Sequence, residues 1–275
     1  MELQISKVSK AFKNNGQPHQ VLKDLSFTVD EGAFVTLLGP SGCGKTTLLN
    51  IIGGFLKATE GEVRLNGTSV SRPGPERGFV FQDYALFPWL TVKENILYPL
   101  KQQKWPATER AKRLQQLLEL AHMEGKENLY PSQISGGMKQ RTAVIRALAP
   151  MPKVLLMDEP LGALDQHLRH RLQEELEAIW IADRTTVLMV THDVDEAVFL
   201  SDRVIVMSSQ NGRITGDINI DLPRPRGRDR GSKTYQAYKD QLTQLVYSSR
   251  TVQENRVGAA PTCSASSFLW TIPIF

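Results

Sequence analysis

The sequence predicts an α/β fold, and three observations lead to this prediction. Short apolar runs recur along the chain with little polar alternation, which is typical of strands buried on both faces of a parallel sheet. Stretches with helical spacing of apolar residues lie between these runs, and alternating strands and helices indicate an α/β architecture. A chain of 275 residues with 41% hydrophobic and 23% charged residues also has the composition of a globular protein with a sizeable core.

The predicted strands are runs rich in Val, Leu, Ile or Phe. They cover residues 34–38, 78–81, 154–157, 186–190 and 204–207. Each run is short and carries few polar residues, so we expect apolar neighbours on both faces of the sheet.

Helical spacing of apolar residues is clear at residues 111–121 and 168–179. A further stretch interrupts the strand pattern, and we interpret residues 90–149 as an inserted helical subdomain. The main domain is then predicted to cover residues 1–222, and residues 223–250 follow as a basic linker and one C-terminal helix.

The composition changes after this main domain. The segment PRPRGRDRGSK at residues 223–233 holds four arginines, one lysine and two prolines, which predicts an exposed linker. A helix is expected over residues 234–248. Residues 251–275 show neither a helical nor a strand period, and no role is predicted for this tail.

Charge and cysteine content narrow the function classes only a little. The formal net charge of +4 permits acidic partners such as nucleic acid, but an ordinary solvated surface is favoured. Cys43 and Cys263 are expected to be reduced thiols, because no secretion signal is visible. No apolar run approaches the roughly 20 residues that span a bilayer, so we expect a cytoplasmic protein.

A glycine-rich segment after the first buried run carries the strongest chemical signal. GPSGCGKTT fits the pattern G-x-x-x-x-G-K-[ST], follows the strand FVTLL and opens a helical run, which is the context of a phosphate-binding loop. Its backbone N–H groups are expected to face phosphate oxygens, with Lys45 on the β- and γ-phosphates and Thr46 on Mg²⁺. The predicted nucleotide contacts come from Gly39, Pro40, Ser41, Gly42, Cys43, Gly44, Lys45, Thr46 and Thr47.

Two acids end another buried run, VLLMDEP at residues 154–160. A buried strand delivers Asp158 to its carboxyl end, where ligands bind in such sheets. Asp158 is therefore a candidate Mg²⁺ ligand, and Glu159 is placed to polarise an attacking water. A strand ending in an ordinary polar turn has the same letters, but the phosphate loop favours the catalytic interpretation.

Six motifs in a fixed order extend this pattern: the phosphate loop, VFQD, ISGG, VLLMDEP, GALD and VTHD. The series, over about residues 2–222, resembles the nucleotide-binding subunits of ABC transporters. The resemblance implies a P-loop NTPase domain with a RecA-like core, an antiparallel β subdomain and the inserted helical subdomain. It also implies ATP hydrolysis, ATP and Mg²⁺ as cofactors, and a homodimer as the working assembly.

The resemblance implies roles for individual residues. Phe12 matches an aromatic residue that stacks on adenine, and Gln82 matches a glutamine that senses Mg²⁺ and the attacking water. Asp165 matches an acid that communicates across the dimer, and His192 matches a switch histidine near the γ-phosphate. The predicted catalytic residues are Glu159, His192 and Gln82, and the predicted Mg²⁺ ligands are Thr46, Gln82 and Asp158.

The segment ISGGMKQ resembles the family signature, which implies that Ser135, Gly136 and Gly137 contact the γ-phosphate of ATP bound to the opposite subunit. Ser135 is expected to cap the following helix, and the glycines allow close backbone approach. Ile134 and Met138 depart from the commoner Leu and Gln of the signature. We expect a working site in which position 138 lacks an amide that could donate a hydrogen bond.

A narrower resemblance links PGPERGFVFQDYALFPWLTVKENI, THDVDEAVFLSDRVIVMS and DLPRPRGR to the nitrate/sulfonate/taurine branch of importer ATPases. It implies a peripheral subunit on the cytoplasmic face of the cell membrane, a separate integral permease and an extracytoplasmic solute-binding protein, with no nucleic acid partner. Trp89 and Leu90 are expected to lie partly in the core of the helical subdomain. Docking of the permease is expected on an aromatic-rich patch made of Tyr84, Leu86, Phe87, Pro88 and Trp89.

Two other functions stay open at this point. A non-transport ABC ATPase acting on nucleic acid or ribosomes usually has a long coiled coil or tandem cassettes, and the sequence indicates neither. A P-loop kinase shares the phosphate loop but does not explain ISGG or VTHD. The transported solute cannot be read from the sequence, because such a subunit does not touch it. Nitrate, an alkanesulfonate, taurine and a pyrimidine precursor all stay open.

Overall fold

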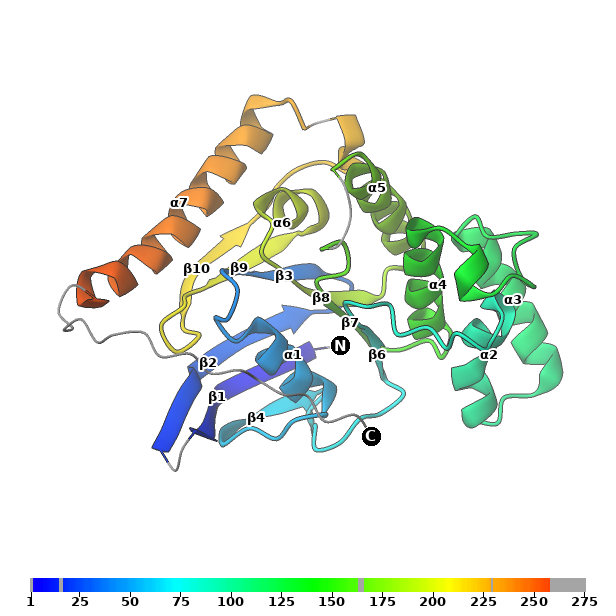
Figure 1. Cartoon of the computed structure of the whole chain (residues 1–275), viewed down its shortest axis with the longest axis horizontal. Coiled ribbons are helices and arrows are strands. Elements are labelled where there is room, and N and C mark those ends of the chain that lie inside the picture. The colour runs from blue at the N-terminus through cyan, green and yellow to red at the C-terminus, as the bar shows by residue number, and fades with distance from the viewer. Residues whose placement is uncertain (1, 15–16, 163–165, 229, 258–275) are drawn as a thin grey trace, which may run out of the picture.

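The computed structural model describes residues 2–14, 17–162, 166–228 and 230–257, which form two sheets and their flanking helices (Figure 1). One sheet is antiparallel, with four strands in the order β2-β1-β4-β5. Its strands are β1 (Glu2–Asn14), β2 (Gln17–Asp30), β4 (Glu60–Leu65) and β5 (Thr68–Ser69). This sheet is the antiparallel β subdomain that the family resemblance implied.

The second sheet forms the centre of the fold, with six strands in the order β10-β9-β3-β8-β7-β6. The parallel strands are β3 (Phe34–Leu38), β6 (Arg77–Val80), β7 (Val154–Asp158), β8 (Thr186–Thr191) and β9 (Arg203–Met207). Strand β10 (Ile214–Asn219) pairs antiparallel with β9 at one edge. The five predicted strands are thereby confirmed, with small shifts at their ends.

Burial on both faces explains why these strands lack polar alternation. Every residue of β7 is buried. Val154 and Leu156 belong to the core shared with the antiparallel sheet, whereas Leu155 and Met157 belong to the core under the helices. Successive side chains point to opposite faces of a strand, so a strand between two cores is apolar throughout.

The helices divide between the two sides of the central sheet. Helix α1 (Lys45–Gly53) shares its core with the antiparallel sheet, while α5 (Gln166–Asp183) and α6 (Val194–Leu200) belong to the other core. A separate lobe beside the sheet corresponds to the predicted helical subdomain (Figure 1, right). It holds α2 (Val92–Gln102), α3 (Ala107–Leu120), the 3₁₀ helix η1 (Pro131–Gln133) and α4 (Gly136–Leu148).

The prediction of an exposed linker at residues 223–233 is wrong for Arg226, the second of its four arginines. A short 3₁₀ helix, η2 (Arg226–Arg228), and α7 (Lys233–Val257) follow β10, and Arg226 is only 1% exposed. The predicted C-terminal helix is confirmed, and it lies against α6 and β9. Residues 258–275 of the predicted tail lie outside the described residues. Within the described ranges, no helix combines the length and apolar character needed to cross a membrane.

The prediction that Trp89 lies partly in the core is also wrong, because its side chain is 70% exposed. Its ring lies 5.7 Å from the ring of Phe87. Tyr84, Leu86 and Leu90 are half-buried, and the first two pack against the core between the central sheet and its helices. The short segment between β6 and α2 therefore half-buries Tyr84, Leu86 and Leu90 and presents Trp89 to the surface.

Candidate functional site

The phosphate loop joins β3 to α1 and is shaped by close backbone contacts. Gly39 leaves the strand at a place where an added Cβ would lie 2.5 Å from the Met207 carbonyl oxygen, so only glycine fits. Gly44 has a φ of 98° and immediately precedes α1. The unpaired N–H groups of the first helical turn follow directly, which is the arrangement that binds phosphate at helix N-termini.

Lys45 is the first residue of α1, and its side chain is 4% exposed. Its Nζ donates hydrogen bonds to the carbonyl oxygens of Gly39, at 2.8 Å, and Pro40, at 3.0 Å. The same Nζ lies 4.0 Å from Oε1 of Glu159. The ammonium group is thus held against the loop, on backbone acceptors that bound phosphate oxygens could replace.

Thr46 links α1 to the end of β7, because its hydroxyl donates to Asp158 Oδ1 at 2.9 Å. Burial raises the pKa of the Asp158 carboxyl group, and the hydrogen bond from Thr46 acts in the opposite direction. A hydroxyl and a carboxylate at this spacing are oxygen ligands of the kind that Mg²⁺ prefers. A buried carboxylate also gains from a nearby cation, so this pair fits the predicted Mg²⁺ site.

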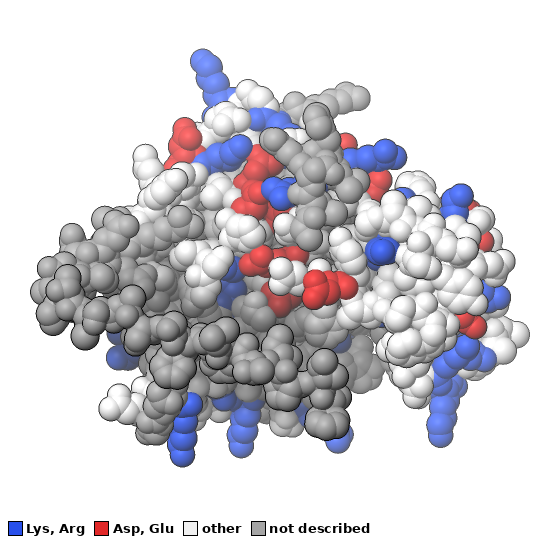
Figure 2. Space-filling view, viewed as in Figure 1, with Lys and Arg blue, Asp and Glu red and all other residues white. Residues whose placement is uncertain are grey.

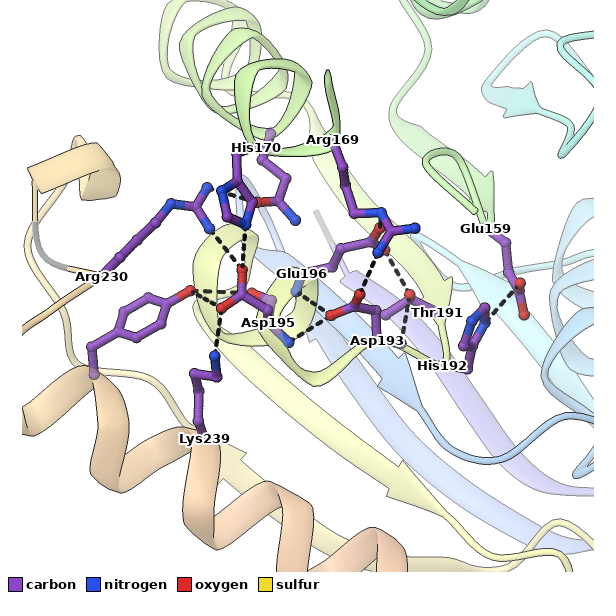
Figure 3. A network of polar contacts seen from close by, with 12 residues as sticks. Glu159, Arg169, His170, Thr191, His192, Asp193, Asp195, Glu196, Arg230 and Lys239 are labelled. Carbon is purple, nitrogen blue, oxygen red and sulfur yellow. Dashed lines mark hydrogen bonds and ion pairs between the residues drawn. The ribbon is translucent and has the colours of Figure 1, made fainter. Parts of the chain in front are cut away.

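Glu159 and His192 form a pair at the carboxyl ends of two neighbouring strands (Figure 3). Oε2 of Glu159 lies 2.9 Å from Nδ1 of His192. The Glu159 backbone has a φ of 42°, and its N–H donates to the Val190 carbonyl oxygen at 3.0 Å. Holding a non-glycine residue in this left-handed backbone conformation costs about 1–3 kcal/mol of strain, and such strain clusters at functional sites.

Two further predicted residues approach this edge of the sheet. Strands β6 and β7 run parallel with Val80 beside Met157, so Gln82 leaves the sheet at the same edge as Glu159. Gln82 is exposed. Phe12, on the β1–β2 hairpin, is 41% exposed and has Lys10 Nζ 5.1 Å from its ring centroid.

The hairpin that carries Phe12 lies against the phosphate loop. An added Cβ on Gly44 would meet Cδ2 of Leu22 at 2.5 Å, and Leu22 pairs with Lys10 in the hairpin. The exposed aromatic ring of Phe12 therefore stands on an element that contacts the loop. Asp165, the predicted dimer-communication residue, lies outside the described residues.

Ser135 stands on a different part of the molecule. It is exposed at the N-terminus of α4, where its hydroxyl accepts a hydrogen bond from Met138 N–H at 3.3 Å, so the predicted cap is confirmed. Gly136 is half-buried and Gly137 is buried. Helix α4 lies against α2 and β6, well apart from α1 (Figure 1). One chain therefore does not bring its signature segment onto its own phosphate loop.

A groove opens between the central sheet and the helical lobe, with a volume of about 400 Å³. Its wall is largely apolar and includes Phe79, Phe81, Ala85, Phe87, Tyr98, Pro99 and Ala147. Arg146 of α4 also lines it and donates to the carbonyl oxygens of Tyr84, at 2.9 Å, and Ala85, at 2.6 Å. Of the predicted docking patch, Phe87 reaches this groove.

The family model for the ABC transporter matches residues 22–162, which is half of the chain. This chain belongs to the ABC transporter family. The ABC-type fold and the ATPase activity predicted from the sequence are confirmed, and ATP is the nucleotide that this family binds.

Relatives of this ABC protein match along most of their length. An uncharacterized ABC transporter ATP-binding protein of Methanocaldococcus jannaschii is 45% identical over 246 residues, covering 90% of this chain and 91% of the relative. The aliphatic sulfonates import ATP-binding protein SsuB of Bacillus cereus is 43% identical, covering 89% and 95%. The bicarbonate transport ATP-binding protein CmpD of Synechocystis is 44% identical, covering 89% of both chains.

A solved structure of an ABC cassette matches the fold. The dimeric post-hydrolysis state of the cassette MJ0796, bound to ADP and Pi, superimposes with a TM-score of 0.69 at 34% identity. The match covers 80% of this chain and all of the other. The cassette architecture therefore extends well beyond the phosphate loop.

Several residues around this ABC site were not foreseen from the sequence. Arg146 holds Tyr84 and Ala85, whose φ values of 60° and 47° are strained, through their carbonyl oxygens. Arg169 donates to Asp193 Oδ2 at 3.0 Å, next to His192. Such arginines carry no local signal, because their acceptors lie far away in the sequence.

Met138 packs half-buried against the core of the helical lobe. Its backbone, rather than its side chain, serves the cap: the N–H donates to Ser135, and the carbonyl oxygen accepts from Thr142 at 2.8 Å. We therefore expect Met138→Gln to change kcat and KM for ATP by less than about twofold, since the backbone groups that serve the cap are retained. Steady-state ATPase kinetics measure this, and a large gain in kcat would show that the missing amide matters.

Glu196 is a buried carboxyl group behind the Glu159–His192 pair. Oε2 of Glu196 accepts a hydrogen bond from the Thr191 hydroxyl at 2.6 Å, and burial raises the pKa of this carboxyl to about 7. Because the folded pKa lies above the ordinary value, the folded chain binds more protons between about pH 4.5 and 7, and stability falls as pH rises through that window.

Glu196→Gln is expected to remove this pH dependence. Relative to wild type, the variant should gain up to about 3 kcal/mol in free energy of unfolding on going from pH 5 to pH 8. Urea unfolding at both pH values measures the difference. Glu62→Gln, at a half-exposed carboxylate paired with Arg64, is the control. A Glu196→Gln offset that is equal at both pH values would contradict the argument.

Proposed function

We propose that this chain is the ATP-hydrolysing subunit of an ABC importer for a small anion or sulfonate-type solute. The observation that carries the proposal is the convergence of Lys45, the Thr46–Asp158 contact and the Glu159–His192 pair at one edge of the central sheet. Likeness to the subunits named for aliphatic sulfonate import and for bicarbonate transport supports the importer branch and the solute class. Nitrate, alkanesulfonates and taurine stay predictions.

ATP binding would use the loop from Gly39 to Thr47. Backbone N–H groups of the loop and the first turn of α1 would hold the phosphates, and Lys45 would exchange its carbonyl partners for phosphate oxygens. Phe12 would stack on the adenine. These contacts share the negative charge of the triphosphate among many fixed donors, which favours both binding and the transition state.

Thr46, Asp158 and Gln82 would hold Mg²⁺ together with the nucleotide. When bound, Mg²⁺ supplies charge neutralisation on the phosphate oxygens. The existing contact between Thr46 and Asp158 supports this assignment, because the two oxygens already lie 2.9 Å apart. Removing the Thr46 hydroxyl or the Asp158 carboxylate is expected to weaken Mg²⁺-dependent hydrolysis more than it weakens folding.

Hydrolysis would depend on Glu159 and His192. Glu159 would orient the attacking water and accept its proton, and Gln82 would help to position that water. His192 would donate a hydrogen bond to the γ-phosphate while Glu159 fixes the orientation of its ring. The strained backbone of Glu159 supports a functional role over a structural one.

Each site would be completed by a second copy of the chain. Ser135, Gly136 and Gly137 begin α4, which belongs to the helical lobe and lies apart from α1 (Figure 1). In a homodimer they would cover the γ-phosphate on the opposite subunit, with Asp165 communicating between the two sites. ATP would then stabilise the closed dimer by binding it better than the open state.

The permease would dock in the groove beside the helical lobe. The groove is apolar and lined by aromatic rings, which suits a short helix of an integral membrane protein. Figure 2 shows a broad surface over this lobe with few charged side chains. The subunit would thereby work at the cytoplasmic face of the membrane. A solute-binding protein would act on the outer side, and no nucleic acid is expected to take part.

Tyr98→Glu is expected to release the subunit from membranes, because it places a charge in the apolar groove. The measurement is recovery of the tagged chain with native membranes and identification of the integral protein cross-linked to it. Tyr247→Glu, at an exposed aromatic residue of α7, is the matched control. Equal membrane recovery for wild type, Tyr98→Glu and Tyr247→Glu, together with ATP hydrolysis stimulated by nucleic acid, would favour a non-transport ABC ATPase instead.

A further inference from the structure

The short helix α6 begins immediately beyond His192. Asp193 caps it, because Oδ1 of Asp193 accepts hydrogen bonds from the N–H groups of Asp195, at 2.7 Å, and Glu196, at 3.2 Å. Arg169 holds the other carboxylate oxygen of Asp193 at 3.0 Å. Only Asp193 separates His192 from α6, so the position of His192 depends on the orientation of the first turn of α6.

A cluster of donors from the C-terminal part of the chain fixes that first turn (Figure 3). The Asp195 carboxylate accepts hydrogen bonds from Arg230 Nη1 at 2.7 Å, Lys239 Nζ at 2.9 Å and the Tyr235 hydroxyl at 3.2 Å. Burial alone would raise the pKa of Asp195, but these donors outweigh it and lower the pKa, which keeps the carboxylate ionised. The cluster is therefore a set of charge-assisted contacts.

The same basic segment also holds the other end of α6. The Arg226 guanidinium donates to the carbonyl oxygens of Val198, at 2.9 Å, and Ser201, at 2.6 Å. Arg224 donates to the Leu200 carbonyl oxygen at 2.7 Å. The guanidinium of Arg230 lies 3.8 Å from the centroid of the Phe199 ring. Arg224, Arg226 and Arg230 thus contact both ends of the helix and one of its buried side chains.

A helix as short as α6 has little stability of its own, so its neighbours set its orientation. Its apolar residues from Ala197 to Leu200 are fully buried and attach it to the core. Apolar contact is non-directional, however, and does not by itself set the rotation of a helix about its axis. The polar contacts at the two ends of α6 supply that direction.

We propose that Arg224, Arg226, Arg230 and the start of α7 form a brace that positions His192 against Glu159, with Asp195, Arg230 and Lys239 as positioning residues for ATP hydrolysis. The inference rests on the proposed function of the Glu159–His192 pair. Loosening the first turn of α6 would shift the imidazole relative to the γ-phosphate and leave the phosphate loop unchanged. The effect would therefore fall on kcat rather than on the KM for ATP.

The test uses the full chain with Arg230→Met and Lys239→Met. Each is expected to lower kcat about tenfold with KM nearly unchanged, since small misplacements at a reacting centre are costly. Arg203→Met is the matched control, because the Arg203 side chain makes a similar ion pair, but with Asp217, and otherwise donates to the Thr28 carbonyl oxygen. Lys239→Arg should restore much of the rate, because it returns a donor to Asp195.

A spectroscopic readout separates positioning from general stability. The chain has five histidines, and the imidazole resonance of His192 can be assigned by its loss in His192→Gln. We expect this resonance to shift in Arg230→Met and Lys239→Met, but not in Arg203→Met. An unshifted resonance with an unchanged kcat in well-folded variants would overturn the brace.

Failure of the proposed function would look different. A wild-type chain that did not hydrolyse ATP would contradict the assignment of the reaction, and the His192 resonance would still decide whether the brace exists. If Arg230→Met does not fold, Lys239→Met decides, because Lys239 is 32% exposed and sits on the outer helix α7.

Discussion

Glu159→Gln is expected to reduce the ATP turnover number by about 10³-fold and to spare ATP binding, because general-base catalysis contributes roughly 10²–10⁴-fold. Glutamine has nearly the shape of glutamate and can still accept a hydrogen bond from His192, but it cannot take a proton from water. Glutamine meets the same backbone strain at this position, so we expect no effect on folding. Single-turnover hydrolysis and equilibrium binding of a fluorescent ATP analogue measure the two effects.

The same substitution should also stabilise the ATP-bound dimer, because the step that would reopen it is blocked. Sedimentation with ATP and Mg²⁺ tests this directly. Glu62→Gln is the control, since that half-exposed carboxylate pairs with Arg64 on the antiparallel sheet, away from the site. Hydrolysis that continues at the wild-type rate in Glu159→Gln would remove Glu159 from the role of the base.

The central sheet could be predicted because its strands are buried on two faces. Val154 to Met157 supply one core and then the other in alternation, and this leaves an uninterrupted apolar run in the sequence. The phosphate loop could be predicted because close approach at Gly39 and the positive φ at Gly44 demand glycines at fixed spacing. Local geometry of this kind leaves local residue patterns.

The C-terminal segment could not be predicted in the same way. Arginine, proline and glycine together indicate an exposed linker, yet Arg226 is buried because it satisfies the carbonyl groups at the end of α6. Those acceptors are more than 20 positions away in the sequence, and their arrangement depends on the tertiary fold. The prediction for Trp89 is wrong in the opposite direction, because this large aromatic residue was expected in the core but lies on the surface. Composition predicts neither case.

The incomplete site of a single chain leads to the second large effect. Lys45→Met removes the ammonium group, and its apolar side chain suits the buried position. Ser135→Asp keeps a residue that caps helices well but sets a negative charge against the partner's γ-phosphate. Each variant alone should lose nearly all ATPase activity. An equimolar mixture should regain about one quarter of the wild-type rate, since half of the dimers then hold one intact site.

The recovery depends on which chain supplies the phosphate loop of an ATP site and which chain supplies its signature segment. In a mixed dimer, the phosphate loop of the Ser135→Asp chain meets the signature of the Lys45→Met chain, and both of these halves are unchanged. Mixing Lys45→Met with a chain that carries both substitutions is the control, because no combination then yields an intact site. Recovery in the first mixture and none in the second is expected from ATPase rates at equal total protein. No recovery in either mixture, with mixed dimers detected by sedimentation, would mean that Ser135 does not act on the ATP of the opposite chain.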